Sequence, residues 1–181
     1  MVESTFRLNV AIKGGIIDTN SAIIKIRRSQ LSENYAQEGS VLHVLANSPS
    51  QQILDRSAIP LQILDSRIER NWAISNMVKL QGYQLLIDNC QIIDNEAKFV
   101  THGFQLNQAD LYIENSEIYF TDALTQKLLG QRNSKVDSGF FNLILESQLF
   151  LSSTKITGLV SKRQAVLNSS MKSSVTLSDN V

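Results

Sequence analysis

The sequence has one cysteine, two prolines and eight glycines among its 181 residues. Cys90 on its own can form neither an internal disulfide nor a cysteine zinc cluster, and a lone cysteine within an apolar segment is typical of a small buried side chain. No Asn-Gly or Asp-Gly pair is present. Because two-residue hairpins favour those pairs, a β-rich chain without them is not expected to be an antiparallel sandwich of tight hairpins.

The sequence also lacks an excess of either charge and any long apolar run. Its 17 basic and 17 acidic residues balance, which argues against a nucleic-acid partner bound through its phosphates. No stretch of 18 apolar residues occurs, so no membrane span is predicted. The start, MVESTFRLNV, has no basic region followed by an apolar run, so no signal peptide is visible. Hydrophobic residues nevertheless make up 43% of the chain, enough for the core of one domain.

One eight-residue phrase recurs along the chain: apolar, any, apolar, any, any, small, any, apolar. It begins at Ile24, Leu61, Leu85, Leu111 and Leu149, and again at Val175, where the C-terminus cuts the copy short. The small residues of the six copies are Ser29, Ser66, Cys90, Ser116, Thr154 and Asn180, and they are 37, 24, 26, 38 and 26 residues apart. These gaps are typical of a repeat of about 25 residues with two insertions of about a dozen. Val10 to Ile17 also fits, either as another side of the first repeat or by coincidence.

The phrase predicts two short strands joined by a corner. Leu111 and Ile113 share one strand face, and Ser116 and Ile118 share another, but the phase slips by one between the two pairs. A two-residue corner at 114–115 produces that slip and keeps all four side chains inward. The second corner position should adopt a left-handed backbone, which Asn and Asp tolerate best among non-glycine residues. It holds Asp65, Asn89, Asn115 and Asp179, with Arg28 and Ser153 as exceptions.

A strand, a corner and a second strand that repeat every 24 residues or so predict an all-β fold, a right-handed parallel β-helix of about six coils. Successive coils would stack about 4.8 Å apart. Equivalent residues would form two inward ladders. The first is Ile26, Ile63, Ile87, Ile113, Leu151 and Leu177, and the second is Leu31, Ile68, Ile92, Ile118 and Ile156.

From about Ile24 to the end, this pattern resembles the right-handed parallel β-helix, or pectin-lyase-like, superfamily, in which Asn-rich corners and ladders of small and aliphatic residues are general. The resemblance rests on architecture and indicates no family within the superfamily. Residues 1–181 are expected to form a single β-helix domain, with loop excursions at 32–60 and 121–139. Because the last copy of the phrase is incomplete, we expect a segment of a longer solenoid, with a C-terminal edge that further chain or a partner covers.

The resemblance implies chemistry that the sequence carries only in part. Enzymes of the superfamily act on acidic polysaccharides from a groove on the outer wall, either as lyases with calcium-holding acids and a basic residue or as hydrolases with clustered aspartates. Neither constellation is evident, and no Asp-Asp pair occurs. Thr101-His102-Gly103 is only faintly similar to the Gly-His-Gly of the hydrolases. We therefore predict no catalytic residue.

Two outward ladders are candidate sites. The first corner position places Asp88 and Glu114 next to each other, a candidate calcium site with Asp94 or Asp122. Two carboxylates are too few to hold calcium well, and a solvated acidic edge is the favoured explanation. The position between the first two apolar residues reads Lys25, Gln62, Leu86, Tyr112, Phe150 and Thr176. Leu86, Tyr112 and Phe150 form either a binding strip or a surface that the 122–139 excursion covers.

These observations leave three classes of function open. The first is a non-catalytic β-solenoid module for structure or adhesion, which binds a polysaccharide or a protein through its outer wall at the cell surface or outside the cell. The second is a polysaccharide lyase or glycoside hydrolase of the pectin-lyase-like group. The third is a scaffold subunit of a large intracellular assembly. No cofactor is expected apart from the candidate calcium.

Overall fold

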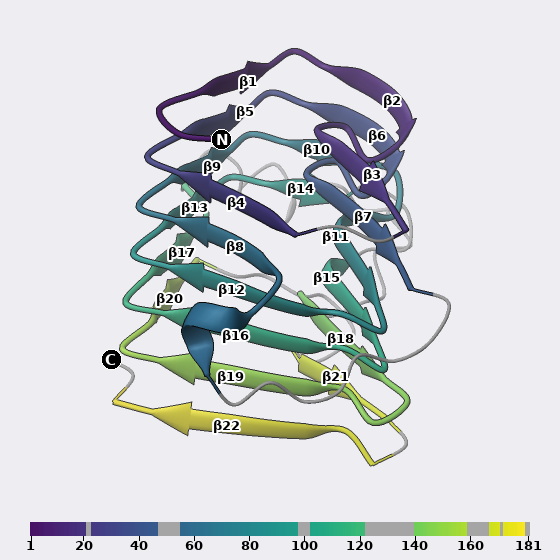
Figure 1. Cartoon of the computed structure of the whole chain (residues 1–181), viewed down its shortest axis with the longest axis vertical. Coiled ribbons are helices and arrows are strands. Elements are labelled where there is room, and N and C mark those ends of the chain that lie inside the picture. The colour runs from purple at the N-terminus through teal and green to yellow at the C-terminus, as the bar shows by residue number, and fades with distance from the viewer. Residues whose placement is uncertain are drawn as a thin grey trace.

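The computed structural model describes residues 1–20, 23–46, 55–97, 102–121, 140–158, 167–170 and 172–179. Within these parts the fold is all-β, and every pair of neighbouring strands is parallel. The strands form four sheets, here called A to D, and within each sheet the strands lie one below another from the N-terminal to the C-terminal end of the molecule (Figure 1). The predicted all-β class and the parallel strand direction are thus confirmed.

Sheets A and B each contain six strands. Sheet A consists of β4 (Ile24–Arg27), β8 (Leu61–Leu64), β12 (Gln84–Asp88), β16 (Asp110–Glu114), β19 (Gln148–Ser152) and β22 (Ser174–Ser178). Sheet B consists of β1 (Thr5–Arg7), β5 (Gln30–Ser32), β9 (Arg67–Glu69), β13 (Gln91–Ile93), β17 (Glu117–Tyr119) and β20 (Lys155–Thr157).

Sheets C and D contain four and six strands. Sheet C consists of β2 (Val10–Lys13), β6 (Tyr35–Glu38), β10 (Trp72–Ala73) and β14 (Glu96–Ala97). Sheet D consists of β3 (Ile17–Thr19), β7 (Leu42–Leu45), β11 (Asn76–Gln81), β15 (His102–Asn107), β18 (Phe141–Ile144) and β21 (Leu167–Ser169). A single 3₁₀ turn, η1 (Arg56–Ala58), is the one helical element in the described part of the chain.

The chain visits the sheets in a fixed cycle. From β1 to β16 consecutive strands fall in sheets B, C, D and A in turn, and after four strands the chain returns to each sheet one strand further along. This arrangement is compatible with a parallel β-helix. It also explains the match at 10–17, because β2 and β3 are two other sides of the first round. The first round begins at β1, earlier than the start near Ile24 that the sequence indicated.

Both predicted inward ladders are in register. Strand pairing joins Ile26 to Leu177 through every intermediate member, and Leu31 to Ile156 likewise. Side chains in the middle of each ladder are at most 1% exposed, whereas Leu177 in the last strand of sheet A is 65% exposed. The core therefore runs along the axis on which the rounds lie above one another. The ladder residue of each round is buried by the ladder residues of the rounds above and below it.

The corner between sheets A and B has the predicted backbone. The second corner residue has a positive φ, between 47° and 51°, in every described round: Glu3, Arg28, Asp65, Asn89, Asn115, Ser153 and Asp179. The small residue that follows is buried at Ser29, Ser66, Cys90, Ser116 and Thr154, while Asn180 lies outside the described residues. At Ser29, Ser66 and Ser116 the hydroxyl of this residue accepts a hydrogen bond from a backbone N–H of the corner in the neighbouring round. Ser66 Oγ, for example, donates to Leu64 O at 2.6 Å and accepts from Ser29 N at 3.1 Å.

A row of asparagines at the corner between sheets B and C was not predicted. Asn9, Asn34, Asn71 and Asn95 each follow a residue with positive φ, and the side-chain amides form a hydrogen-bonded ladder with N···O distances of 2.7 to 2.9 Å. The amide oxygens of Asn34, Asn71 and Asn95 also accept from the backbone N–H of the asparagine in the round above. The buried side-chain amides of Asn34, Asn71 and Asn95 are paired in this way.

The described part of the interval 32–60 contains regular structure, although the sequence indicated a loop excursion there. Strands β6 and β7 belong to sheets C and D, so the additional length of this round falls after Leu45. Residues 47–54 lie outside the described part, and so does the predicted excursion at 121–139 apart from Thr121.

Replacing one asparagine of the ladder tests its contribution to stability. Asn71 is fully buried, its Nδ2 donates to Leu31 O and Asn95 Oδ1, and its Oδ1 accepts from Asn34. We expect Asn71→Ala to lower the free energy of unfolding by about 3 kcal/mol, because it leaves several buried groups unpaired. Asn9→Ala, at the exposed end of the same ladder, is the control and should cost less than about 1 kcal/mol. Equal losses in urea unfolding of the two variants would contradict this role.

Candidate functional site

The outward ladder of sheet A is buried at its apolar centre, at Leu86 and Tyr112, and exposed at Lys25 and Thr176. The register is as predicted, but Leu86 and Tyr112 are only 6% and 1% exposed, and Phe150 is half-buried. Together with Ile59 and Leu64 they form a second hydrophobic cluster outside the sheet, in which the rings of Tyr112 and Phe150 stack at 4.6 Å. The sequence prediction required exposure at these positions, and that requirement is not met at Leu86 and Tyr112.

The segment around η1 supplies part of the cover. Gln62 Nε2 donates to Ser57 O at 3.0 Å and to Ile59 O at 2.9 Å, and Lys25 Nζ donates to Ser57 O at 3.3 Å. Lys25 and Gln62 belong to the same outward ladder as Leu86 and Tyr112. The polar end of the ladder thus fixes the backbone of residues 57–59 over sheet A, and the apolar end packs against Ile59.

The candidate calcium ligands are adjacent but are engaged with other groups. Asp88 and Glu114 are partners in the pairing of β12 with β16, as predicted, and Asp88 Oδ1 accepts from Asn115 Nδ2 at 2.9 Å. Asp94 lies beyond the other end of β13, where it accepts from the backbone N–H and hydroxyl of Thr121. Asp122 lies outside the described residues. Within the described residues no three His, Cys, Asp or Glu side chains are grouped as metal ligands.

Two further ionisable groups are enclosed and cannot act as surface sites. Cys90 is 2% exposed, and burial raises the pKa of its thiol to about 12, so it stays uncharged at neutral pH. His43 is 1% exposed on the outer side of sheet D, with Nδ1 2.7 Å from Asp18 Oδ1 and Nε2 3.3 Å from Glu38 Oε2. Lys79 donates to Glu38 at 2.6 Å. This hydrogen bond outweighs burial and holds the pKa of Glu38 below its ordinary value.

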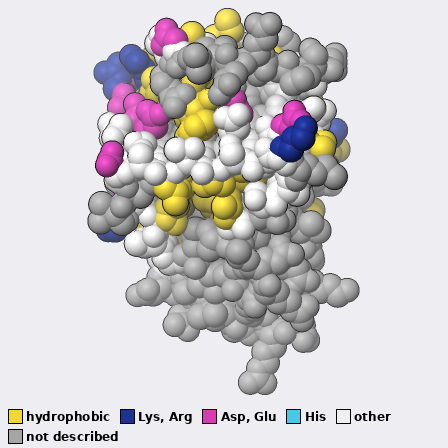
Figure 2. All heavy atoms as spheres, turned by 90° about the horizontal axis from the view of Figure 1, so that it is seen from below, with side chains coloured by type: hydrophobic (Ala, Val, Ile, Leu, Met, Phe, Trp, Pro, Cys, Tyr) yellow, Lys and Arg dark blue, Asp and Glu magenta, His cyan; other side chains and the backbone are white. Residues whose placement is uncertain are grey.

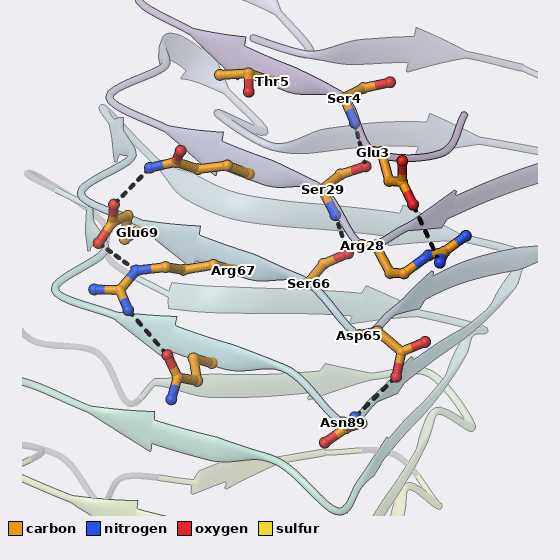
Figure 3. A pocket seen from close by; sticks show the side chains of 12 residues that line it. Glu3, Ser4, Thr5, Arg28, Ser29, Asp65, Ser66, Arg67, Glu69 and Asn89 are labelled. Carbon is orange, nitrogen blue, oxygen red and sulfur yellow. Dashed lines mark hydrogen bonds and ion pairs between the residues drawn. The ribbon is translucent and has the colours of Figure 1, made fainter.

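An open polar groove of about 900 Å³ lies along the corner between sheets A and B and across the outer face of sheet B (Figure 3). The corner contributes charged and amide side chains, namely Glu3, Arg28, Asp65 and Asn89. Sheet B contributes Thr5, Gln30, Arg67, Glu69 and Gln91, and the hydroxyl residues Ser4, Ser29 and Ser66 lie between the two. The groove thus offers amides, hydroxyls, carboxylates and guanidinium groups to a ligand.

Strand register sets the side chains of the groove in rows. Pairing across sheet B aligns one outward position in all six strands, which reads Thr5, Gln30, Arg67, Gln91, Glu117 and Lys155. Neighbouring strands lie about 4.8 Å apart, so polar groups recur at that interval along the wall. A second outward row contains Arg7, Ser32 and Glu69. We call the groove residues, together with Arg7, Glu33 and Arg70, the sheet B wall.

Glu69 is the centre of a hydrogen-bonded network in this wall. It is 6% exposed, and its carboxylate accepts from Gln30 Nε2 at 2.9 Å, Arg67 Nε at 2.8 Å and Arg70 Nη2 at 3.3 Å. Arg67 Nη1 also donates to Gln91 Oε1 at 3.0 Å. Burial by itself raises the pKa of Glu69, but the hydrogen bonds from Arg67 and Gln30 and the charges of Arg67 and Arg70 outweigh it, and the pKa lies below its ordinary value of 4.5.

The outward row of sheet B corresponds to one position of the recurring phrase, which the phrase leaves open to any residue. It is the seventh position of the phrase, which holds Gln30, Arg67, Gln91, Glu117 and Lys155 in the five complete copies. All five are long and polar, a regularity that indicates a solvent-facing wall. No sequence pattern indicates the hydrogen bonds and ion pairs of Glu69 and Arg70, because their partners come from rounds 37 residues apart.

Comparison of the chain with models of known protein families, with curated proteins and with solved structures finds no match. In the described part of the chain no helix is long and apolar enough to cross a membrane. The geometry of the sheet B wall is therefore the basis for a functional hypothesis.

Truncation of Tyr112 tests the structural role of the covered cluster. We expect Tyr112→Ala to lower the free energy of unfolding by about 3 kcal/mol, because it removes a buried aromatic side chain between Ile59 and Phe150. Thr176→Ala, at an exposed position of the same ladder, should change stability by less than about 0.5 kcal/mol. A Tyr112→Ala variant as stable as the Thr176→Ala variant would show that the cluster is not packed.

The lowered pKa of Glu69 predicts a loss of stability in acid. A carboxylate with a depressed pKa in the folded state stabilises the fold above its unfolded pKa, and this contribution disappears as the pH falls through the folded value. The thermal midpoint of the protein should therefore fall below pH 4.5, and that of Glu69→Gln should fall less steeply over the same range. Parallel pH profiles for the two proteins would contradict the assignment.

Proposed function

We propose that the chain is a right-handed parallel β-helix whose sheet B wall binds a glycan without catalysis. The cyclic passage through sheets B, C, D and A supports the helix. Crossover connections between parallel strands of one sheet are right-handed in nearly all proteins, which supports the hand. The proposed role is structural or adhesive, at the cell surface or outside the cell, because such glycans are found there.

One observation carries the proposed binding role, namely the aligned row of long polar side chains on sheet B. Its amides and guanidinium groups are held in register about 4.8 Å apart, and a repeating polymer can satisfy such a row with successive hydroxyl groups. Gln91 and Arg67 are exposed at its centre, beside the groove. Protein hydrogen bonds to hydroxyl groups are individually modest, so a row of them suits a long ligand.

The pairing of the carboxylates favours binding over hydrolysis. Glu3 lies 3.1 Å from Arg28, Glu69 accepts from Arg67, and Asp65 accepts from Asn89 at 2.8 Å. General acid catalysis needs a carboxyl group that keeps its proton near neutral pH, whereas the pKa of Glu69 is lowered. These contacts support a wall that recognises a polymer and leaves it intact.

A protein partner at the end of the stack is a second candidate. Viewed from the C-terminal end, the described residues show apolar side chains among polar ones (Figure 2). Leu177 of β22 is 65% exposed there, and within the described strands β22 pairs on one side only. An exposed strand edge with an apolar residue favours pairing with a further strand, supplied by more of the same chain or by a partner.

A polysaccharide panel tests the proposed function. Neutral and acidic polymers, each with and without calcium, are incubated with the protein and scored for binding and for cleavage. We expect binding without cleavage, and Gln91→Ala should weaken it about fivefold, the equivalent of one lost hydrogen bond.

Gln37→Ala is the matched control, since Gln37 is an exposed glutamine on a strand of sheet C, away from the wall. Equal effects of the two variants, or no binding to any polymer, would reject the proposed wall. Cleavage of a polymer would identify an enzyme instead.

A further inference from the structure

The sheet B wall contains charges of both signs that cancel. Its basic groups are Arg7, Arg28, Arg67 and Arg70, and its acidic groups are Glu3, Glu33, Asp65 and Glu69. Each arginine lies within 3.3 Å of a carboxylate of the same set: Arg7 and Arg70 meet Glu33, Arg28 meets Glu3, and Arg67 meets Glu69. The wall is therefore rich in charged atoms but has no net charge.

Among the four carboxylates Glu69 is the most deeply placed and has the most partners. It is 6% exposed and accepts from Arg67 in its own strand, as Figure 3 shows. It also accepts from Gln30 in the round above and from Arg70 at the adjacent corner. Glu33 forms ion pairs with both Arg70 and Arg7, and it is linked to Glu69 through Arg70. Glu69 thus sets both the orientation of Arg67 and the charge that a ligand meets next to it.

We propose that Glu69 is the specificity-determining residue of the sheet B wall and restricts it to uncharged, hydroxyl-rich polymers. This inference rests on the proposed function, because it concerns the ligand class of the same wall. It names a selective residue, whereas the proposed function requires only that the wall binds.

The contacts of Arg67 explain how Glu69 would act. Arg67 Nε donates to Glu69 and Nη1 donates to Gln91, so each of the two N–H edges that could bind a carboxylate or sulfate already has one N–H engaged. A ligand anion would have to displace Glu69 and would meet the charge of Asp65 as well. A hydroxyl group has neither problem, because it can accept from an amide or a guanidinium N–H and donate to a carboxylate oxygen.

Removal of the Glu69 charge should reverse this preference. The wall would then carry one net positive charge, and an oxyanion would compete for Arg67 with an uncharged amide oxygen in place of a carboxylate. The variant Glu69→Gln keeps the size of the side chain, so the wall keeps its shape while its charge changes.

Dextran and dextran sulfate test the inference, because they share a backbone and differ in charge. For the unmodified protein we expect tighter binding to dextran than to dextran sulfate. For Glu69→Gln we expect the ratio of the two dissociation constants to shift at least tenfold toward dextran sulfate. Glu146→Gln removes the same charge at a site in contact with Lys172, and it should shift the ratio less than twofold.

The outcomes separate the inference from the proposed function. A gain of dextran sulfate binding in Glu69→Gln, together with dextran binding by the unmodified protein, supports the inference. An unmodified protein that binds neither polymer rejects the proposed function and the inference with it. An unchanged ratio in Glu69→Gln, or a shift equal to that of Glu146→Gln, overturns the inference even if the unmodified protein binds dextran.

A measurement on the unmodified protein covers the case in which Glu69→Gln does not fold. In nitrogen-15 spectra the Arg67 Nε–H, assigned with Arg67→Lys, should exchange with solvent at least ten times more slowly than the Nε–H of Arg28, whose contact to Glu3 is made through Nη1. Equal exchange rates at the two arginines would show that Glu69 does not hold Arg67, and the inference would fail.

Discussion

The structure depends on how the backbone is satisfied at its corners. Within the sheets, each parallel strand bonds to the rounds above and below, but at the corners the backbone turns out of the sheets. At the corner between sheets A and B a small inward side chain supplies a partner for the backbone N–H of the neighbouring round, as Ser66 Oγ does for Ser29 N. At the corner between sheets B and C an asparagine ladder does the same. Because an unpaired buried polar group costs about as much as several favourable contacts gain, these residues fix where the chain can turn.

Fixed corners determine the register of everything between them. Once Asp65, Asn89 and Asn115 turn at equivalent points, the aliphatic residues of successive strands must lie above one another, and so must the outward residues. The sheet B wall is thus a consequence of corner geometry: Gln30, Arg67 and Gln91 are aligned because the corners before them are aligned. The Glu69 network then adds contacts between rounds that alignment alone does not provide.

The sequence indicated the elements that repeat and missed those that arise from contacts between distant segments. The strands of sheets A and B, the left-handed corner at Asn89 and the ladder from Ile26 to Leu177 follow from one phrase, because a stacked fold imposes the same requirement on every round. The asparagine ladder lay outside the window of the phrase. The burial of Tyr112 depends in part on Ile59, a residue of an insertion, and no periodic pattern predicts where an insertion folds back. The partners of Glu69 could not be predicted for a similar reason, since they require the register and the corner conformation together.

The alignment of the outward row along sheet B is the central claim, and a distance between spin labels tests it most directly. Labels at Thr5 and Lys155, both exposed, lie at the two ends of the row and are joined by five strand pairings. With strands about 4.8 Å apart, the account predicts a narrow distance distribution centred at roughly 24 Å, broadened by the label tethers. A pair at Thr5 and Glu117 should give a mean about 5 Å shorter. A broad distribution, or equal means for the two pairs, would contradict the stacked arrangement on which the wall depends.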